Sequence, residues 1–470
     1  MTFFAQLRWE WRLAVRSRAT LATLGLLLGL LAAGAIAGLG AAGRVRREVD
    51  AARAEEVSRR SKLRAGLEAI ERGAAPPGDE WNDPRRAGFW LEGAARLIAR
   101  EPTPLAALAP GTLERERPVA LVGGLRAQNA LEPEPLRSPR RFAEGSVELG
   151  SVLAWLLPLF VIALTFDATS RERERGSLAL ALAQGVSPSR FLAAKVLAFA
   201  LPVAVAASAT IAAIAALGTP RTDVAGLALG ATGVVAYVGV WAGTAAWVNT
   251  WGRPSAVNAV ALLGLWLLTA IALPLGASAA ARAAFAPPSR IEAIVTARAA
   301  SAPVRSEGSK LLKQYYEDHP ELARERTDLT DFMKKLVLVE DRVAAAIAPF
   351  DERHDRALEE QQALAGRLLW LSPALTVTSL FESLAGSDPA AGRAFRAEVR
   401  RAHEGLRAFV LPRLYGDVPM RAADVDALPP VAPVRARGVG ATAVARVAWL
   451  AALGAGLWAL AMRRARRGLL

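Results

Sequence analysis

The residues of this 470-residue chain that are best suited to a specific interaction form a short charged stretch between two apolar runs. After the uncharged run Leu149–Phe166, the charges alternate in sign over Arg171, Glu172, Arg173, Glu174 and Arg175, and Gly176, Ser177 and Leu178 follow. Side chains of both signs can pair with a charged cleft on another protein. Gly176 would permit a turn with positive φ, and Ser177 could cap a helix over Leu178–Gln184. We therefore interpret Arg171–Leu178 as a docking element and the short helix as a lever, the alternative being a solvated loop.

Catalytic and metal chemistry has little support elsewhere in the sequence. The chain has no cysteine, which excludes disulfides, thiolate nucleophiles and zinc–thiolate sites. We expect its three histidines, His319, His354 and His403, to be surface residues rather than metal ligands. A phosphate-binding G-x-x-x-x-G-K-[ST] loop is also missing from the sequence. We therefore expect no catalytic residue, metal site or cofactor, and a chain that is not itself an enzyme.

Hydrophobic residues make up 53% of the chain and gather in six uncharged runs. Because a spanning helix needs about 20 apolar residues, these runs predict membrane spans at 19–43, 149–166, 196–217, 224–251, 255–281 and 442–462. In the last span Arg446 would lie in the first turn and snorkel to the surface. The predicted fold class is an all-α polytopic membrane protein with six transmembrane helices.

The charged residues fit a polytopic membrane protein better than a nucleic-acid-binding protein or an ion-driven carrier. The net charge of +14 lacks the aromatic interleaving of a nucleic-acid reader, so we expect no nucleic-acid partner. The spans contain no internal Asp, Glu, Lys or His, and ion-driven carriers normally keep such a group at membrane depth. Energy would therefore arrive from outside the membrane.

Basic residues orient the spans. The N-terminal stretch 1–18 carries Arg8, Arg12, Arg16 and Arg18 against Glu10 alone, and the tail 463–470 is basic. By the positive-inside rule both termini and the loop 167–195 are cytoplasmic. Residues 1–18 are expected to form an amphipathic helix in the membrane interface, or else a simple basic flank.

Two long segments, 44–148 and 282–441, then lie on the extracytoplasmic side as a mostly helical two-part domain. The first is expected to extend the first span as a charged helix, to break at Pro76-Pro77-Gly78, and to continue as irregular or short-stranded chain. In the second, Phe332–Ile347 and Asp355–Leu369 have helical spacing and predict an antiparallel hairpin. The uncharged range Leu368–Phe381 is too short to span, and we expect it to be hairpin core or interfacial surface.

The charged stretch resembles the coupling loop of type-2 ABC transporter permeases, with their E-x-E-x-G-[ST]-L pattern at Glu172–Leu178 and a trailing basic residue at Lys195. Further similarity points to one branch of that family, which carries two large extracytoplasmic insertions, is catalogued as a domain of unknown function and is often labelled a multicopper-enzyme-maturation permease. The residues that carry it are Pro104–Gly111, Pro287–Glu292, Asp318–Leu322, Leu371–Ala374 and Leu384–Asp388.

The resemblance implies a permease subunit in a bacterial inner membrane, expected to export a solute. Its partners would be a separate ATPase subunit that binds ATP, a second permease subunit of the same or another kind, membrane lipid and an extracytoplasmic protein. The alternative is a membrane-anchored assembly or signalling module, in which the same ATPase remodels an extracytoplasmic partner without moving a solute. The substrate and the direction of transport stay open at this point.

Overall fold

The computed structural model describes residues 2–110, 118–125, 148–218, 223–289, 291–292, 294–296, 298–299, 313–318, 329–434 and 440–467. Within these residues six helices are long and apolar enough to cross a membrane: Arg18–Glu71, Leu149–Glu174, Pro188–Gly218, Val224–Asn249, Ser255–Ala284 and Ala441–Arg466. Each expected span falls on one of them. The prediction of a mainly helical chain with six candidate spans is confirmed at this level.

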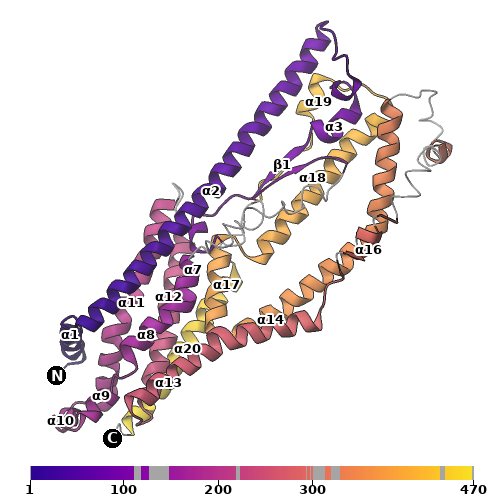
Figure 1. Ribbon diagram of the computed structural model, residues 1–470. Coiled ribbons are helices and arrows are strands. Elements are labelled where there is room, and N and C mark those ends of the chain that lie inside the picture. The colour runs from indigo at the N-terminus through magenta and orange to yellow at the C-terminus, as the bar shows by residue number, and fades with distance from the viewer. Residues whose placement is uncertain are drawn as a thin grey trace.

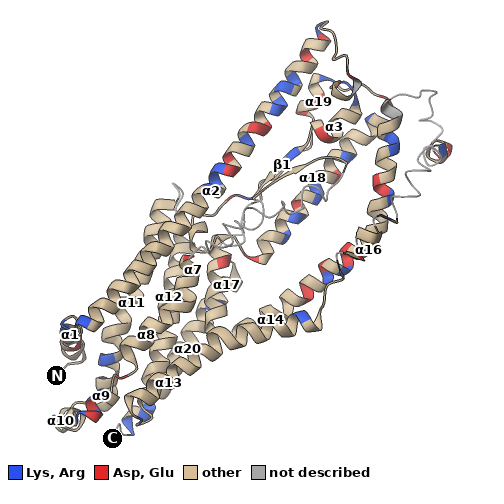
Figure 2. Cartoon of the chain, viewed as in Figure 1, with Lys and Arg blue, Asp and Glu red and all other residues tan. Residues whose placement is uncertain are grey.

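The candidate spans pack as one elongated bundle (Figure 1). It contains the first part of α2 (Arg18–Glu71), α8 (Leu157–Thr165), α11 (Pro188–Gly218), α12 (Val224–Asn249), α13 (Ser255–Trp266) and α20 (Ala441–Arg466). Both chain termini lie at one end of the bundle, beside α1 (Phe3–Ala14), α9 (Ser170–Glu174) and α10 (Ser177–Ala183). Figure 2 shows that charged residues gather at that end and in the part of the chain beyond the bundle.

Small residues bring α12 and α20 together. A Cβ on Gly243 would lie 3.3 Å from the carbonyl oxygen of Gly454, and a Cβ on Gly454 would lie 3.2 Å from the backbone nitrogen of Val240. Close approach of this kind is the usual role of glycine between membrane helices.

Two spans contain a π-helical segment, each followed closely by a proline. These are η3 (Val152–Leu156), which follows α7 (Leu149–Ser151), and η4 (Leu267–Ala272), which continues into α14 (Leu273–Ala284). Proline cannot donate a backbone hydrogen bond, so carbonyl groups are released here. Side chains from other segments bind them: Tyr237 Oη donates to Ala154 O at 2.6 Å, Trp266 Nε1 to Trp155 O at 3.1 Å and Ser372 Oγ to Thr269 O at 2.6 Å.

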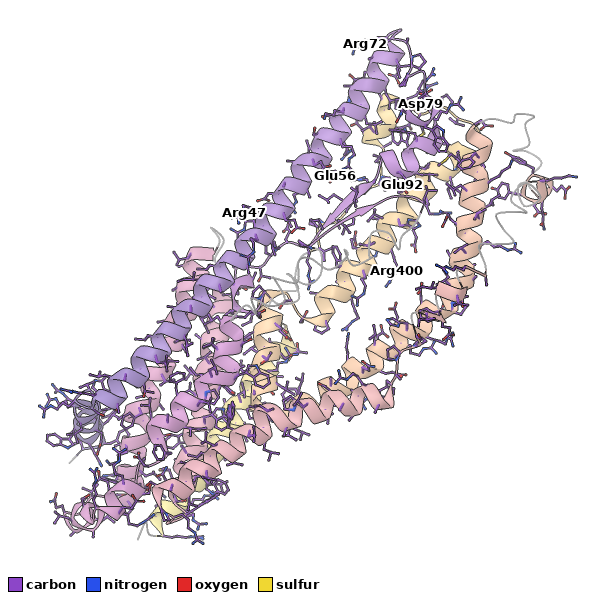
Figure 3. The ribbon with its side chains drawn as sticks, viewed as in Figure 1. Arg47, Glu56, Arg72, Asp79, Glu92 and Arg400 are labelled. Carbon is purple, nitrogen blue, oxygen red and sulfur yellow. The ribbon has the colours of Figure 1, made fainter. Side chains whose placement is uncertain are left out.

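The second half of α2 leaves the bundle and supports a distal domain, as the expected charged extension would (Figure 3, Arg47 to Arg72). Beyond it come η1 (Glu80–Asn82), α3 (Ala87–Gly93), β1 (Arg96–Ala99) and β2 (Val119–Val122), while η2 (Ala106–Leu108), between the two strands, is buried in the core of the bundle. The two strands pair antiparallel with Arg96 opposite Val122. α16 (Leu329–Leu368), α18 (Pro389–Tyr415) and α19 (Ala422–Asp426) complete the domain, whose main core contains Leu67, Trp90, Val337, Leu406 and Leu414.

The predicted antiparallel hairpin is wrong. Phe332–Ile347 and Asp355–Leu369 do not fold back on each other, because Leu329–Leu368 is one helix of 40 residues. Helical spacing alone does not separate one long helix from two short ones, and Pro349 bends a helix more readily than it reverses one. Figure 1 shows α16 bent along its length. Its partners are α14 and α18 instead: Gln361 donates to Phe285 O after α14, and Arg400 of α18 lies 3.9 Å from Asp355 (Figure 3).

The uncharged range Leu368–Phe381 packs in the bundle, rather than forming hairpin core or interfacial surface as expected. It forms η6 (Leu369–Leu371) and most of α17 (Pro373–Ala385), and α17 packs against α12 and α20. Gly230 and Gly233 of α12 leave room for Leu384 and Leu380 of α17, which are buried in the same core as the spans.

Arg446, which was expected to snorkel to the surface, is half-buried beside α17. It donates to Ser379 O at 3.0 Å and to Ser383 Oγ at 2.7 Å, both on α17. The guanidinium group therefore ties α20 to α17.

Candidate functional site

The charged stretch Arg171–Leu178 forms two short helices joined by a tight turn. Thr169 precedes α9, and Gly176 separates α9 from α10 with φ of 74°. This is the left-handed conformation that favours glycine, as the sequence indicated. A second glycine with positive φ, Gly185, follows α10 before α11 begins at Pro188.

Ser177 does not cap α10 as expected. It is the first residue of the helix, Gly176 occupies the N-cap position, and the hydroxyl of Ser177 turns back to donate to the carboxylate of Glu172. The hydroxyl also contacts Glu172 O at 3.2 Å. Ser177 thus fastens α10 to α9 rather than satisfying the N–H groups of its own helix.

The Glu172 carboxylate is half-buried and pairs with a lysine of another helix. Lys195 Nζ of α11 lies 2.8 Å from Glu172 Oε1 and 3.4 Å from Glu10 Oε2 of α1. Burial raises the pKa of Glu10, and the charge of Lys195 opposes that shift. Lys195 therefore joins three helices, α1, α9 and α11, through one ammonium group.

Glu174 and Arg173 contact the turn that begins α13. The backbone N–H of Ser255 donates to Glu174 Oε1 at 2.6 Å, and the Ser255 hydroxyl lies 3.0 Å from Glu174 Oε2. Arg173 donates to the carbonyl of Arg253. A carboxylate at the N-terminus of a helix is favourable because it satisfies free N–H groups there.

Asn249, near the end of α12, binds the junction between α8 and α9. Its Oδ1 accepts from Thr169 N at 3.0 Å, its Nδ2 donates to Thr165 O at 3.0 Å, and its own carbonyl accepts from Thr169 Oγ1 at 3.0 Å. Asn249 is buried. The signal for it in the sequence is an amide in the last turn of an apolar run.

The remaining predicted site residues divide into a buried and an exposed group. Leu178 is buried against the bundle, whereas Arg175 is exposed and Arg171 is exposed while pairing with Asp167. On α10, Leu180 exposes 65% of its surface. The outward surface of the element therefore carries Arg171, Arg175 and Leu180, while Glu172 is half-buried and Glu174 is exposed but bound to Ser255.

The described residues offer no arrangement suited to metal binding, since they contain no group of three His, Asp or Glu side chains that could hold an ion. His403 instead donates through Nδ1 to Gly123 O at 2.8 Å. His319 lies outside the described residues.

Residues 290–432 match the family described as Domain of unknown function (DUF3526). This range covers most of the second long segment, including α16, α17 and α18. No curated protein and no solved structure matches the chain.

Proposed function

We propose that the chain is the transmembrane permease subunit of an ATP-binding-cassette exporter in a bacterial inner membrane. A separate ATPase subunit would drive it through α9 and α10, and a second permease subunit would complete the transporter. The single observation that carries this proposal is the way α9 is fixed: it contacts α11 through Lys195, α12 through Asn249 and α13 through Ser255. A displacement of α9 would therefore move three candidate spans together.

The contacts also suggest which residues meet the ATPase. The Glu172 and Glu174 carboxylates already bind Lys195 and Ser255, so docking through them would require an exchange of partners. Leu180 and Arg175 are exposed at the surface of the element without that cost. We expect the ATPase to contact the α10 side, while the two glutamates keep the element attached to the spans.

Purification of the tagged chain in mild detergent from its own cells tests this proposal. We expect an ATPase subunit to co-purify, recognised by mass spectrometry and by ATP turnover. Leu180→Glu should lose it, since a charge in an apolar contact is unfavourable. Leu121→Glu on β2, also at an exposed leucine, is the matched control and should retain it. ATPase retention by Leu180→Glu would contradict the docking surface.

A second function, remodelling of an extracytoplasmic partner without solute transport, is favoured by the contacts of α17. Its first turn binds the η4 span through Ser372, and its last carbonyls bind the distal domain, with Thr103 Oγ1 at 2.9 Å from Leu384 O and Arg100 Nη2 at 2.9 Å from Gly386 O. Motion of α13 could pass along α17 to the strands without opening a path for solute.

The two functions differ in what ATP should change. For remodelling, ATP added to the complex should alter the rate at which a cysteine at Leu121 is labelled, and Thr103→Val should weaken the effect. Thr23→Val, whose hydroxyl binds only its own helix, is the control. ATP-driven uptake into inverted vesicles with unchanged labelling at Leu121→Cys would support the exporter and exclude remodelling.

A further inference from the structure

The N-terminal helix α1 has two unlike faces, and one of them has no partner among the residues that the structure describes. Gln6, Glu10 and Ala14, spaced four residues apart, are buried. The helix packs there against α11. Thr2 caps its start, and Ser17 caps the start of α2 only three residues after α1 ends. α1 is thereby held at the end of the first candidate span.

The outer face of α1 combines positive charge with exposed aromatic rings. Arg8, Arg12 and Arg16 are exposed, and 100° per residue places Arg8 and Arg12 opposite Glu10. Phe4 and Trp9 flank them with 77% and 54% of their surfaces exposed. Glu10 is the single acidic residue of the helix, and it is buried. The surface therefore attracts anions and exposes rings of the kind that lie at the headgroup level of a bilayer.

We propose that α1 binds anionic phospholipid headgroups, and that the Glu10–Lys195–Glu172 bridge passes its position to α9. Three observations select a lipid surface over a protein: the exposed face of the helix that carries the arginines has no acidic residue, the aromatic rings border them, and the helix leads directly into a candidate span. Basic amphipathic helices with aromatic residues bind anionic membranes by these two forces together.

The bridge makes the lipid surface relevant to the docking element. Lys195 is mostly buried, with its ammonium group 2.8 Å from Glu172, 3.4 Å from Glu10 and 5.3 Å from the ring centre of Phe191. A buried ammonium group that loses one carboxylate must pair more closely with its other partner, since an unpaired buried charge is unfavourable. Movement of α1 toward the headgroups therefore changes how Lys195 holds α9. This inference needs no ATPase, so its failure would leave the proposed function standing.

Lipid selectivity is tested first, on the full chain in vesicles. A fluorophore on Ala5→Cys, unique because the native chain has no cysteine, reports quenching by brominated phosphatidylglycerol or brominated phosphatidylcholine at equal mole fraction. We expect stronger quenching by phosphatidylglycerol. Arg8→Gln with Arg12→Gln should remove this preference, since two arginines near an anionic surface change local lipid occupancy by on the order of tenfold. Arg342→Gln with Arg356→Gln, exposed on α16, removes the same charge as a control and should keep it.

Transmission is tested second, by the rate at which a water-soluble maleimide modifies Leu180→Cys. The rate should differ between phosphatidylglycerol and phosphatidylcholine vesicles, and Glu10→Gln should abolish the difference while the lipid preference at Ala5 persists. Equal quenching by both lipids, or a preference that survives loss of the arginines, would overturn the lipid surface. Absence of quenching by either lipid would mean that a protein covers α1, and inorganic phosphate reproducing the effect would mean a soluble anion. A lipid-dependent rate in Glu10→Gln would overturn the bridge.

Discussion

At the scale of single residues, Asn249 makes several buried hydrogen bonds to Thr165 and Thr169, at the junction that leads into the docking element. Replacing it with alanine leaves Thr169 N and Thr165 O without their partners in a buried site. An unsatisfied buried group costs about 1–3 kcal/mol, so Asn249→Ala should lower the free energy of unfolding by at least that amount. Thermal unfolding in detergent measures the loss. Gln184→Ala, which removes an exposed amide beside α10, should be close to neutral.

Gly176 tests the turn itself. A Cβ there would meet no atom within 4 Å, yet φ is 74°, so any penalty comes from the backbone. A left-handed conformation costs an ordinary residue about 1–2 kcal/mol, and a β-branched one tolerates it least. Gly176→Val should weaken ATPase co-purification, and Gly176→Asn should do so less. Gly366→Val, in open space within α16 and without positive φ, should have no effect on it. ATPase co-purification by both Gly176 variants at the level of the native protein would mean that the turn is not required.

These two residues mark how far the sequence could predict the site. Gly176 could be recognised because a glycine between a charged helix and an apolar one permits a turn with positive φ, which is a local property of the chain. The partners of Asn249, Thr165 and Thr169, lie about 80 residues away in the chain, and no local pattern indicates such a pairing. For the same reason the inward direction of Glu172 depends on Lys195, 23 residues later.

At the scale of elements, the second half of α2 is expected to stabilise the distal domain. Leu67 is buried in the same cluster as Trp90 and Leu414, whereas Val57, ten residues earlier on the helix, exposes 69% of its surface. Leu67→Ala should cost about 2–5 kcal/mol and Val57→Ala should cost little. Unfolding in denaturant, followed by tryptophan fluorescence, distinguishes them. Equal stability of the two variants would mean that α2 does not pack on the distal core.

The helix α18 carries a pH-sensitive contact. Burial lowers the pKa of His403, and nearby Arg407 lowers it further, against its hydrogen bond to Gly123 O and the charges of Asp341 and Glu404. The folded state therefore prefers the neutral ring. Its stabilisation is present above the ordinary histidine pKa of about 6.5 and is lost as pH falls through the lower folded-state value.

The distal domain should accordingly lose stability when pH falls below about 6.5. His403→Gln should remove that part of the pH dependence, because glutamine does not titrate. Melting temperatures of the two proteins between neutral and mildly acidic pH provide the measurement. Parallel curves for both would show that His403 does not contribute.

The long helix α16 shows why element boundaries were harder to predict than element type. Its apolar spacing correctly indicated helix on both sides of residues 348–354. Whether the chain turns there depends on what each half packs against, and those partners are distant: Arg407 of α18 pairs with Asp341, and Phe285 O accepts from Gln361. Long-range packing decided between one helix and two.

At the scale of the whole molecule, composition predicted the bundle of candidate spans but not the fold of the distal domain. A run of about 20 apolar residues has few alternatives to a membrane helix, so six candidate spans followed from the sequence. The distal fold packs α2 and α3 against α16, α18 and α19, which lie more than about 200 residues later in the chain. The entry of α17 into the bundle was missed for a related reason: a 13-residue apolar helix can enter only where another helix leaves room, here at Gly230 and Gly233.

The arrangement of the two ends leads to a last prediction, on topology. Val57 on the distal part of α2 and Leu180 on α10 are both exposed, and the candidate-span part of α2 and the bundle separate them. If the helices cross a membrane with both termini inside, an impermeant maleimide should label Val57→Cys in right-side-out vesicles and Leu180→Cys in inverted vesicles. Because the native chain has no cysteine, no other residue reacts. Labelling of both positions from one side would contradict the six spans, and the reverse pattern would keep the spans and invert their orientation, placing α10 where no cytoplasmic ATPase could reach it.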